Sequence, residues 1–442
     1  MSDQRHPVHE ILPFGQMFTY GFQHVLAMYA GAVAVPLILA GALHLPVDQL
    51  IFLINADLFT CGLATVIQTM GFWKFGVRIP VIQGVTFAAV TPMIMIGKVH
   101  GLTGIYGAVI VGGLATLLVA PYFSRLIRFF PPVVTGSIIS IIGISLLPVA
   151  VLWVGGGNPS SPDFATAPQI SLAGIVLVMI LCFNRYFTGF LKNIAVLLGL
   201  IIGTIMAIPL GFVNFSSVMK AQWLGMTTPF AFGLPTFDIT AIFSMVLVMI
   251  VVMVETTGDF IAIGEIIDKP ISQDDLTRGL RADGLSTILG GILNCFPYTA
   301  FAQNVGLIGL TGVKSRFVVA MSGVILMVLG LFPKMAAIVA SVPAAVLGGA
   351  GLVMFGVVAA SGIRTLAKVD FNDSQNLMIV AVSLAIGLIP LAMPDFYNKF
   401  PEWTQVVMHS GITAGSLTAV ILNAALNYGK DHSDFTTSIS GK

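Results

Sequence analysis

The number of membrane crossings predicted for this chain depends on two short segments, and the first runs Gln83-Gly-Val-Thr-Phe-Ala-Ala-Val-Thr-Pro-Met-Ile-Met-Ile-Gly97. This segment is apolar, but Gly, Thr and Pro interrupt it, and it is shorter than the roughly 20 residues that a helix needs to cross a bilayer. A second segment, at about 303–312, is also apolar and short, and it begins with Gln and Asn. If both segments cross the membrane, the chain has fourteen crossings, and if neither does, it has twelve.

The composition excludes an ordinary soluble domain. Hydrophobic residues make up 57% of the 442 residues and charged residues only 9%, whereas a soluble domain carries about 25% charged residues. A chain in lipid needs no polar cover, because its outer surface faces hydrocarbon. The net charge of +1 provides no basic surface for nucleic acid. The three cysteines lie in apolar segments and are predicted to be core residues rather than disulfides or metal ligands: Cys61, Cys182 and Cys295.

Twelve further apolar segments are predicted to be spans. They are residues 17–40, 50–71, 103–123, 131–153, 170–184, 193–212, 240–264, 280–295, 317–340, 343–363, 376–393 and 408–427. The first sixteen residues are polar and show no signal-peptide pattern. We therefore expect the first apolar segment to remain in the membrane as a span.

The distribution of Lys and Arg decides between the two counts, since cytoplasmic loops carry an excess of both. With fourteen crossings and a cytoplasmic N-terminus, sixteen of the twenty basic residues lie inside. The other four lie outside: Lys98, Lys220, Lys334 and Lys399. With twelve crossings, Arg125, Arg128, Arg185 and Lys192 would lie outside. We therefore predict fourteen transmembrane segments, with both termini in the cytoplasm.

Matching patterns in the two halves indicate an internal repeat. They are Ala56-Asp57 and Ala282-Asp283, Pro80 and Pro297 before the short segments, and Pro-x-x-Val-x-Gly at 131–136 and 343–348. Each match alone is weak, but their shared order favours a repeat. Seven spans are an odd number, so the second repeat is predicted to be inverted relative to the first. Paired broken segments at mid-membrane mark secondary transporters, with the substrate site where the breaks meet.

Three acidic residues lie where a charge is costly, since an ionisable side chain at the centre of a membrane helix costs roughly 2.5–3.5 kcal/mol on insertion scales. Glu255 and Asp259 are four residues apart and so share one helical face. Asp283 opens the following predicted span, where it is either such a buried acid or part of a solvated helix end. Desolvation disfavours the charged form of a carboxylate, so Glu255 suits a proton-coupled carrier.

Three other polar residues interrupt apolar segments. His24 lies in the first span, where a histidine most often forms a helix–helix hydrogen bond. Gln303 and Asn304 open the second short segment. Their carboxamides either satisfy free backbone groups or present a donor and an acceptor to a planar ligand.

The ten residues Gln303-Asn-Val-Gly-Leu-Ile-Gly-Leu-Thr-Gly312 resemble the signature of the nucleobase–ascorbate transporter family, also called nucleobase–cation symporter 2. That signature reads Gln/Glu/Pro-Asn-x-Gly-x-x-x-x-Thr-Arg/Lys/Gly, and every fixed position is matched. The resemblance is to the xanthine and uric acid permease branch. It extends over nearly the whole chain, through Gln23-His24, Pro80 to Pro92, Glu255 to Asp259 and Ala282-Asp283-Gly284.

The resemblance implies an all-α polytopic membrane protein of fourteen segments in two inverted sevens, with short antiparallel strands in segments 3 and 10. It implies a core domain of residues 17–123 and 240–342 and a gate domain of residues 124–239 and 343–427. Cytoplasmic tails would occupy residues 1–16 and 428–442. Members commonly form homodimers and take up nucleobases with protons across the cytoplasmic membrane.

The resemblance also assigns roles to single residues. Glu255 would accept hydrogen bonds from ring N–H groups of a nucleobase, and Gln303 would pair with a second polar edge. Phe301 and Phe87 would pack on the ring face or shape the pocket. Four residues would hold the polar network together: Asn304, Asp283, His24 and Asp259. A carboxylate, a carboxamide and an aromatic face complement a flat purine with several donors and acceptors.

Other functions compete with a nucleobase carrier. An intramembrane enzyme is not favoured, because no HExxH, Gly-x-Ser-x-Gly or Ser/Lys pattern stands out. An anion exchanger of the same fold would want a cationic site, and near the two breaks the sequence places only Lys314. A channel would not accumulate a solute against its gradient. We expect no cofactor and no metal, with the proton gradient as the driving force.

Two positions bear on the substrate. Gln303 stands at the first signature position, where xanthine and uric acid relatives have Gln and uracil-transporting relatives usually have Glu. Thr86 stands where some xanthine-selective relatives have Asn and uric acid-accepting ones have Thr, although some xanthine carriers also have Thr. We therefore expect a proton symporter for xanthine, uric acid or both, with uracil or another nucleobase as the alternative.

Overall fold

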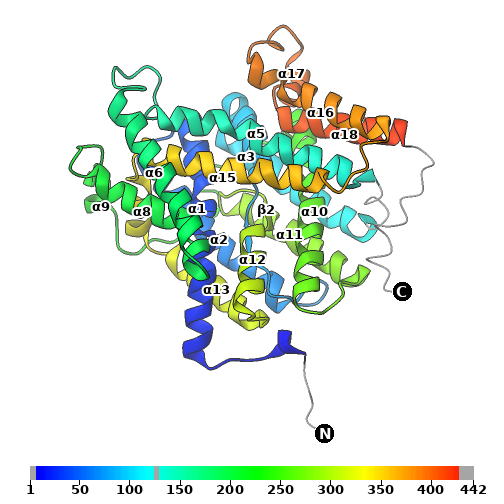
Figure 1. Cartoon of the computed structure of the whole chain (residues 1–442), viewed down its shortest axis with the longest axis horizontal. Coiled ribbons are helices and arrows are strands. Elements are labelled where there is room, and N and C mark those ends of the chain that lie inside the picture. The colour runs from blue at the N-terminus through cyan, green and yellow to red at the C-terminus, as the bar shows by residue number, and fades with distance from the viewer. Residues whose placement is uncertain (1–5, 124–128, 428–442) are drawn as a thin grey trace.

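The computed structural model describes residues 6–123 and 129–427, without the side chains of residues 402, 403 and 406. Arg125, Arg128, residues 1–5 of the predicted N-terminal tail and the whole predicted C-terminal tail (428–442) lie outside the described residues. The described part is built of helices and one pair of short strands (Figure 1).

Eight helical runs among the described residues are long and apolar enough to cross a membrane. They contain α1 (Phe14–Ala42), α2 (Val47–Met70), α3 (Val90–Val119), α5 (Pro132–Val154), α6 (Ala167–Tyr186), α10 (Ile239–Ile266), α15 (Ala344–Leu366) and α16 (Ser374–Ala392). A ninth span arises if α13 (Arg316–Leu329) and α14 (Pro333–Ala340), which bend by 84° at their junction, are taken together. The sequence predicts one continuous span at 317–340, and Pro333 instead starts a new helix there, as proline favours a first helical position.

The remaining elements are shorter or less apolar. They are η1 (Pro7–His9), η2 (Phe87–Ala89), η3 (Ala120–Tyr122), α7 (Phe190–Asn193), α8 (Ala195–Ala207), α9 (Ser216–Lys220), α11 (Gln273–Ile292), α12 (Ala302–Thr311), α17 (Glu402–Met408) and α18 (Gly411–Leu426). Helix α11 begins seven residues before the predicted span at 280–295. Ser272 and Asp275 form a capping box that starts the helix in a charged stretch. Asp283 therefore lies inside α11, which corrects its prediction as the opening of a span.

The first short segment leads directly into the next predicted span. Residues 90–97 of that segment and most of the next belong to α3, which is interrupted at Gly101, where φ is 68° and ψ is −171°. Glycine adopts this backbone conformation without the steric cost that a Cβ would bring. The predicted segments 83–97 and 103–123 thus lie on either side of one glycine.

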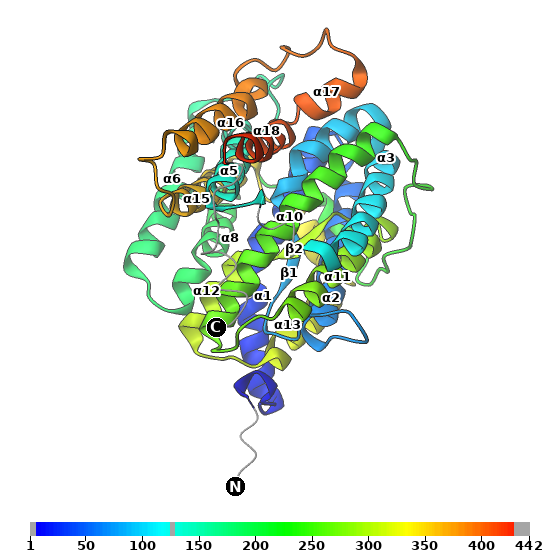
Figure 2. The same ribbon diagram turned by 90° about the vertical axis from the view of Figure 1, so that its right-hand side faces the viewer.

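The helices pack in two sets (Figure 2). In the first set, α2 packs on α13 and α3 packs on α11, with α1 and α10 against them. The second set is built around the long contact between α5 and α15, with α6, α8, α16 and α18 around that pair. The strand pair lies in the first set, where it touches α2, α10 and α11.

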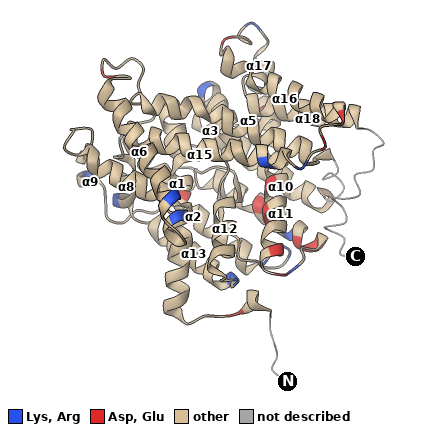
Figure 3. Cartoon of the chain, viewed as in Figure 1, with Lys and Arg blue, Asp and Glu red and all other residues tan. Residues whose placement is uncertain are grey.

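Charged residues are sparse along the chain, as the composition predicts (Figure 3). Most of them stand at helix ends and in loops, whereas acidic positions also occur within α10 and α11. These two helices belong to the set that surrounds the strands, so the acids of α10 and α11 lie in the same set of helices as the strand pair.

Strands β1 (Gln83–Val85) and β2 (Tyr298–Ala300) pair in antiparallel fashion, with Gly84 opposite Thr299. Two further backbone bonds flank the ladder, one from Thr86 N to Pro297 O and one from Phe301 N to Ile82 O, each 3.0 Å long. The prediction of two short antiparallel strands is confirmed, with β1 at the start of the first short segment and β2 just before the second. Residues more than 200 positions apart in the sequence are thereby joined at one place.

Glycines bring the helices of the first set into close contact. A Cβ on Gly62 of α2 would lie 2.3 Å from Gly323 O on α13, and a Cβ on Gly284 of α11 would lie 2.8 Å from Gly113 O on α3. Small residues let membrane helices approach in this way, because apolar burial alone gives little drive for association in lipid.

We expect Gly62→Ala to destabilise the protein by about 1–3 kcal/mol, because the added methyl overpacks the α2–α13 contact. The matched control is Gly356→Ala on α15, where a Cβ meets nothing within 4 Å. Thermal unfolding of the purified proteins in detergent measures both. A Gly62→Ala protein that unfolds at the same temperature as the Gly356→Ala protein would contradict the close packing.

Candidate functional site

The strand pair is anchored by a threonine from a helix on each side. Thr65 Oγ1 on α2 accepts a hydrogen bond from Gln83 N at 3.0 Å, and Thr287 Oγ1 on α11 accepts one from Tyr298 N at 3.2 Å. Both threonines are buried. They satisfy backbone amides that the three-residue strands leave free, which buried backbone requires. The sequence analysis did not single out either threonine.

Helix α10 carries two of the predicted acids and is bonded to β2. Thr256 lies next to Glu255, and its Oγ1 is 3.0 Å from Thr299 Oγ1 and accepts from Ala300 N at 3.3 Å. Glu255 is half-buried, and within the described residues it makes no hydrogen bond. One turn further on, Asp259 is also half-buried, and its Oδ2 has no partner in the described part of the chain. The acids therefore stand beside the strands with acceptors to spare.

Phe301 and Gln303 follow β2 and meet α1 at a glycine. A Cβ on Gly31 would lie 2.9 Å from the Phe301 ring and 3.8 Å from Gln303 Nε2. The ring also covers Gly84 of β1, where a Cβ would lie 2.3 Å from it. Phe301 is buried, whereas Gln303 is exposed in the first turn of α12. The aromatic ring is thus held in place, and the carboxamide remains free to contact a ligand.

His24 and Asn304 bond to each other, as the helix–helix interpretation of His24 predicts. Asn304 Nδ2 lies 3.1 Å from His24 Nδ1 and donates to His24 O at 3.0 Å. Both residues are buried. This pair ties α12 to α1, directly after Gln303, and so fixes the start of the helix that carries the exposed carboxamide.

Thr86 and Phe87 follow β1. Thr86 is buried, and its Oγ1 accepts from Ala88 N at 3.1 Å, which caps the short helix η2. Phe87 is half-buried, and its ring meets Phe355 of α15 edge-on at 5.9 Å. Phe355 in turn lies 6.4 Å from Trp153 of α5. Phe87 therefore contacts the second set of helices.

Asp283 is buried in α11 and accepts a hydrogen bond at 2.8 Å from Gln68 Nε2 on α2. Gln68 Oε1 accepts from Val77 N at 3.0 Å, so this pair holds the segment that leads into β1. Asp283 is a buried acid and not a solvated helix end, which decides between the two interpretations. Gln68 was not predicted, since its partners lie in other segments.

A further buried acid, Asp57, lies in the middle of α2 and was noted in the sequence only as part of a repeated pair. It is bonded to Tyr298 at the start of β2. Asp57 is charged and surrounded by apolar residues in the segment 50–71, the same signal that singled out Glu255. That signal was sufficient to find it.

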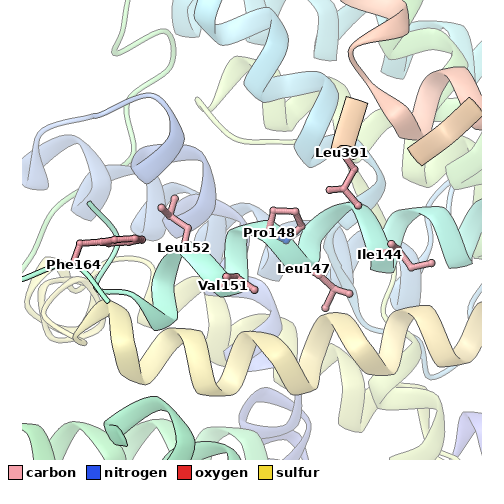
Figure 4. A pocket seen from close by; sticks show the side chains of 7 residues that line it. All are labelled: Ile144, Leu147, Pro148, Val151, Leu152, Phe164 and Leu391. Carbon is pink, nitrogen blue, oxygen red and sulfur yellow. The ribbon is translucent and has the colours of Figure 1, made fainter. Parts of the chain in front are cut away.

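One apolar groove lies apart from this site. It has a volume of about 510 Å³, runs along α5 and is lined by Ile144, Leu147, Pro148, Val151, Leu152, Phe164 and Leu391 (Figure 4). None of the predicted site residues lines it, and its lining offers no side-chain donor or acceptor for a polar solute. Among the described residues no cluster of three or more His, Cys, Asp or Glu side chains could hold a metal ion.

Lys314, the cation considered for an anion site, is already paired. Its Nζ lies 2.6 Å from Asp268 Oδ2 at the surface, and the hydrogen bond from Lys314 lowers the pKa of the Asp268 carboxyl. The charge of Lys314 is therefore directed at a surface carboxylate and not at the strand pair.

Comparison with known proteins gives consistent matches. The sequence model described as the Permease family, which represents the nucleobase–ascorbate transporter family, matches residues 15–396. The chain is 48% identical to a nucleobase transporter of Paenibacillus larvae, with 95% of this chain and 96% of that protein covered. It is 46% identical to a uric acid transporter of Escherichia coli (100% and 93% covered) and 46% identical to a xanthine permease of Bacillus subtilis (94% and 94% covered).

Solved structures share the fold at low identity. The transmembrane domain of a cyanobacterium bicarbonate transporter superimposes with a TM-score of 0.60 at 14% identity, with 94% of this chain and 99% of that chain covered. The murine Slc26a9 anion transporter in its inward-facing state gives a TM-score of 0.59 at 13% identity (95% and 69% covered). These matches show the fold, and the family match shows a multi-pass membrane permease rather than an enzyme. The chain is a member of the nucleobase–ascorbate transporter family of permeases.

Proposed function

We propose that the protein is a proton-coupled symporter that imports an oxidised purine, xanthine or uric acid or both, across the cytoplasmic membrane. The observation that carries this proposal is the grouping around the strand pair. The Phe301 ring and the Gln303 carboxamide both approach Gly31, and Thr256 bonds the helix of Glu255 to β2. A flat ligand with several N–H and C=O groups matches an aromatic face, a carboxamide and a carboxyl group.

The names of the relatives favour a purine over uracil. Uric acid and xanthine are the solutes named for relatives at 46% identity. Gln303 agrees with that choice, because a carboxamide offers both a donor and an acceptor to the edge of an oxidised purine. A uracil carrier is the alternative within the family.

An anion exchanger is disfavoured by the charges near the strands. The side chains that group there include the acids Glu255 and Asp259, which would repel an anion unless both were protonated. Lys314 is paired with Asp268 at the surface. The structural likeness to anion transporters therefore supports a shared fold and not a shared solute.

Paired contacts support an inverted repeat of seven and seven segments. Gly62 on α2 faces Gly323 on α13, and Gly284 on α11 faces Gly113 on α3, which are matched contacts in the two halves. The bonds that flank the strands are matched in the same way. We infer fourteen segments, a core formed by the first set of helices, a gate formed by the second, and both termini in the cytoplasm. A homodimer is part of the same proposal, by resemblance to the family.

Glu255 is proposed to hold the coupled proton. Glu255→Gln keeps the shape of the side chain but removes its titratable group, so we expect accumulation of labelled xanthine or uric acid to be lost. Asp259→Asn is expected to be less severe, because Asp259 supports the network one turn away. The measurement is uptake into proteoliposomes under an imposed proton gradient.

Glu265→Gln is the matched control, since Glu265 is an exposed acid near the end of the same helix. It should accumulate substrate as the wild type does. Accumulation by Glu255→Gln at the wild-type level, with the same dependence on the proton gradient, would falsify the coupling role.

Thr86 is proposed to leave room for the C8 oxygen that distinguishes uric acid from xanthine. Thr86→Asn enlarges the side chain, and Asn can still cap Ala88 N because it is a favoured N-cap residue. We expect the apparent affinity for uric acid to fall about tenfold and that for xanthine to fall less, as a misfit of one group costs roughly 1–3 kcal/mol. Competition of labelled uptake by each unlabelled purine measures this.

Thr86→Ser, which retains the hydroxyl, is the conservative control and should keep the wild-type preference. An equal loss for both purines in Thr86→Asn would rule out the discriminating role. Inhibition of wild-type uptake by uracil but not by xanthine would overturn the choice of an oxidised purine.

A further inference from the structure

Asp57 is a fully buried acid to which the proposed transport mechanism gives no task. Its Oδ1 accepts a hydrogen bond from Tyr298 Oη at 3.1 Å and one from Cys295 Sγ at 3.3 Å, and Cys61 Sγ lies 3.5 Å away. All three donors reach the same oxygen. The other oxygen, Oδ2, is buried and has no partner among the described residues.

This one-sided arrangement fits a neutral carboxylic acid better than a carboxylate. An ionised Asp57 would leave a charged oxygen buried and unpaired, and none of the contacts to its side chain in the described chain comes from Lys, Arg or His. A protonated Asp57 leaves only one O–H group without an acceptor, which costs far less than an unpaired buried charge. The titratable groups facing Asp57 are Cys61 on its own helix and Cys295 and Tyr298 near β2.

The hydrogen bond to Tyr298 reaches the first residue of β2. The backbone N of Tyr298 is bonded to Thr287 of α11, so Asp57 and Thr287 hold the start of the strand between two helices. A strand of three residues has few ladder bonds with which to fix its own position. Phe301 lies three residues after Tyr298, and Gln303 follows it. A shift at Tyr298 would therefore displace both groups that meet at Gly31.

We propose that Asp57 is a positioning residue, which through Tyr298 sets where β2 begins and so where Phe301 and Gln303 stand, without gaining or losing a proton during transport. The proposal rests on the proposed site around the strand pair, but on no particular nucleobase. It separates two kinds of acid in one molecule, since the half-buried Glu255 is expected to titrate and the fully buried Asp57 is not.

The test compares variants that keep and remove the bond. Asp57→Asn keeps an oxygen for the Tyr298 hydroxyl, so KM should remain within about twofold of wild type, with the same dependence of uptake on pH. Asp57→Ala removes that acceptor and leaves the hydroxyl only the contacts to Cys295 Sγ at 3.0 Å and to the backbone O of residue 57 at 3.4 Å. Because the stronger oxygen acceptor is lost, KM should rise about tenfold. Tyr298→Phe should raise KM in the same direction. The double variant should be no worse than Asp57→Ala alone, because both changes remove one bond.

Each KM is measured with the nucleobase that the wild-type protein takes up best from a panel of xanthine, uric acid and uracil. Failure of the oxidised-purine proposal is then seen in the wild type, whereas failure of this proposal is seen only between variants. Uptake is normalised to the amount of protein in the membrane. Ser137→Ala is the matched control, because it removes a buried hydroxyl on α5 that bonds only to its own helix, and its KM should be unchanged.

Two outcomes would overturn the proposal. If Asp57→Asn loses accumulation as Glu255→Gln is expected to, Asp57 titrates in the cycle. If Asp57→Ala and Tyr298→Phe alter only the amount of protein and leave KM unchanged, the bond supports folding and does not position the site.

Discussion

Backbone amides inside a bilayer must find their partners within the protein, because hydrocarbon offers none. Helices meet this requirement themselves, but residues 83–85 and 298–300 are extended. They meet it by pairing with each other and by bonding to Thr65, Thr256 and Thr287 on the surrounding helices. Most of the residues predicted to touch the solute stand within a few positions of this strand pair. Helices begin directly after both strands, and at such helix ends side chains and backbone can point toward a ligand.

Burial divides the polar residues of the site into two groups. The threonines that anchor the strands, and the pair His24 and Asn304, are buried and bonded within the protein. Glu255 is half-buried and Gln303 is exposed. A side chain whose hydrogen-bonding capacity is already used keeps the framework rigid, whereas one with free capacity can exchange water for a ligand. Polar side chains of one site thus serve different purposes according to their burial and their hydrogen-bond partners.

The sequence predicted the long apolar helices, the two short strands and the proximity of residues far apart in the chain. It did not predict the bonds that the anchors make, because the partners of Gln68 and Asp57 lie more than 200 residues away and leave no local pattern. The spacing between residues that make the same contact in the two halves also differs from the spacing between the matching sequence patterns. Thr65 and Thr287 each accept a hydrogen bond from the first residue of a strand and are 222 residues apart, whereas the Ala-Asp matches are 226 residues apart. The two aspartates are thus one helical turn out of step: Asp57 bonds to Tyr298 and Asp283 to Gln68.

One of the contacts between the two sets of helices is an aromatic contact at the site. Phe87 meets Phe355 edge-on, and no hydrogen bond fixes that geometry. Ring contacts can be exchanged for other apolar contacts at little cost, while the hydrogen bonds of the strand pair cannot be broken cheaply in a dry interior. If the proposed gate moves against the proposed core, the contact at Phe87 can slide while the strand pair stays intact. Helices α5 and α15 would then respond to an occupied site through the shape of the apolar surface at Phe87 and not through the charges of the site.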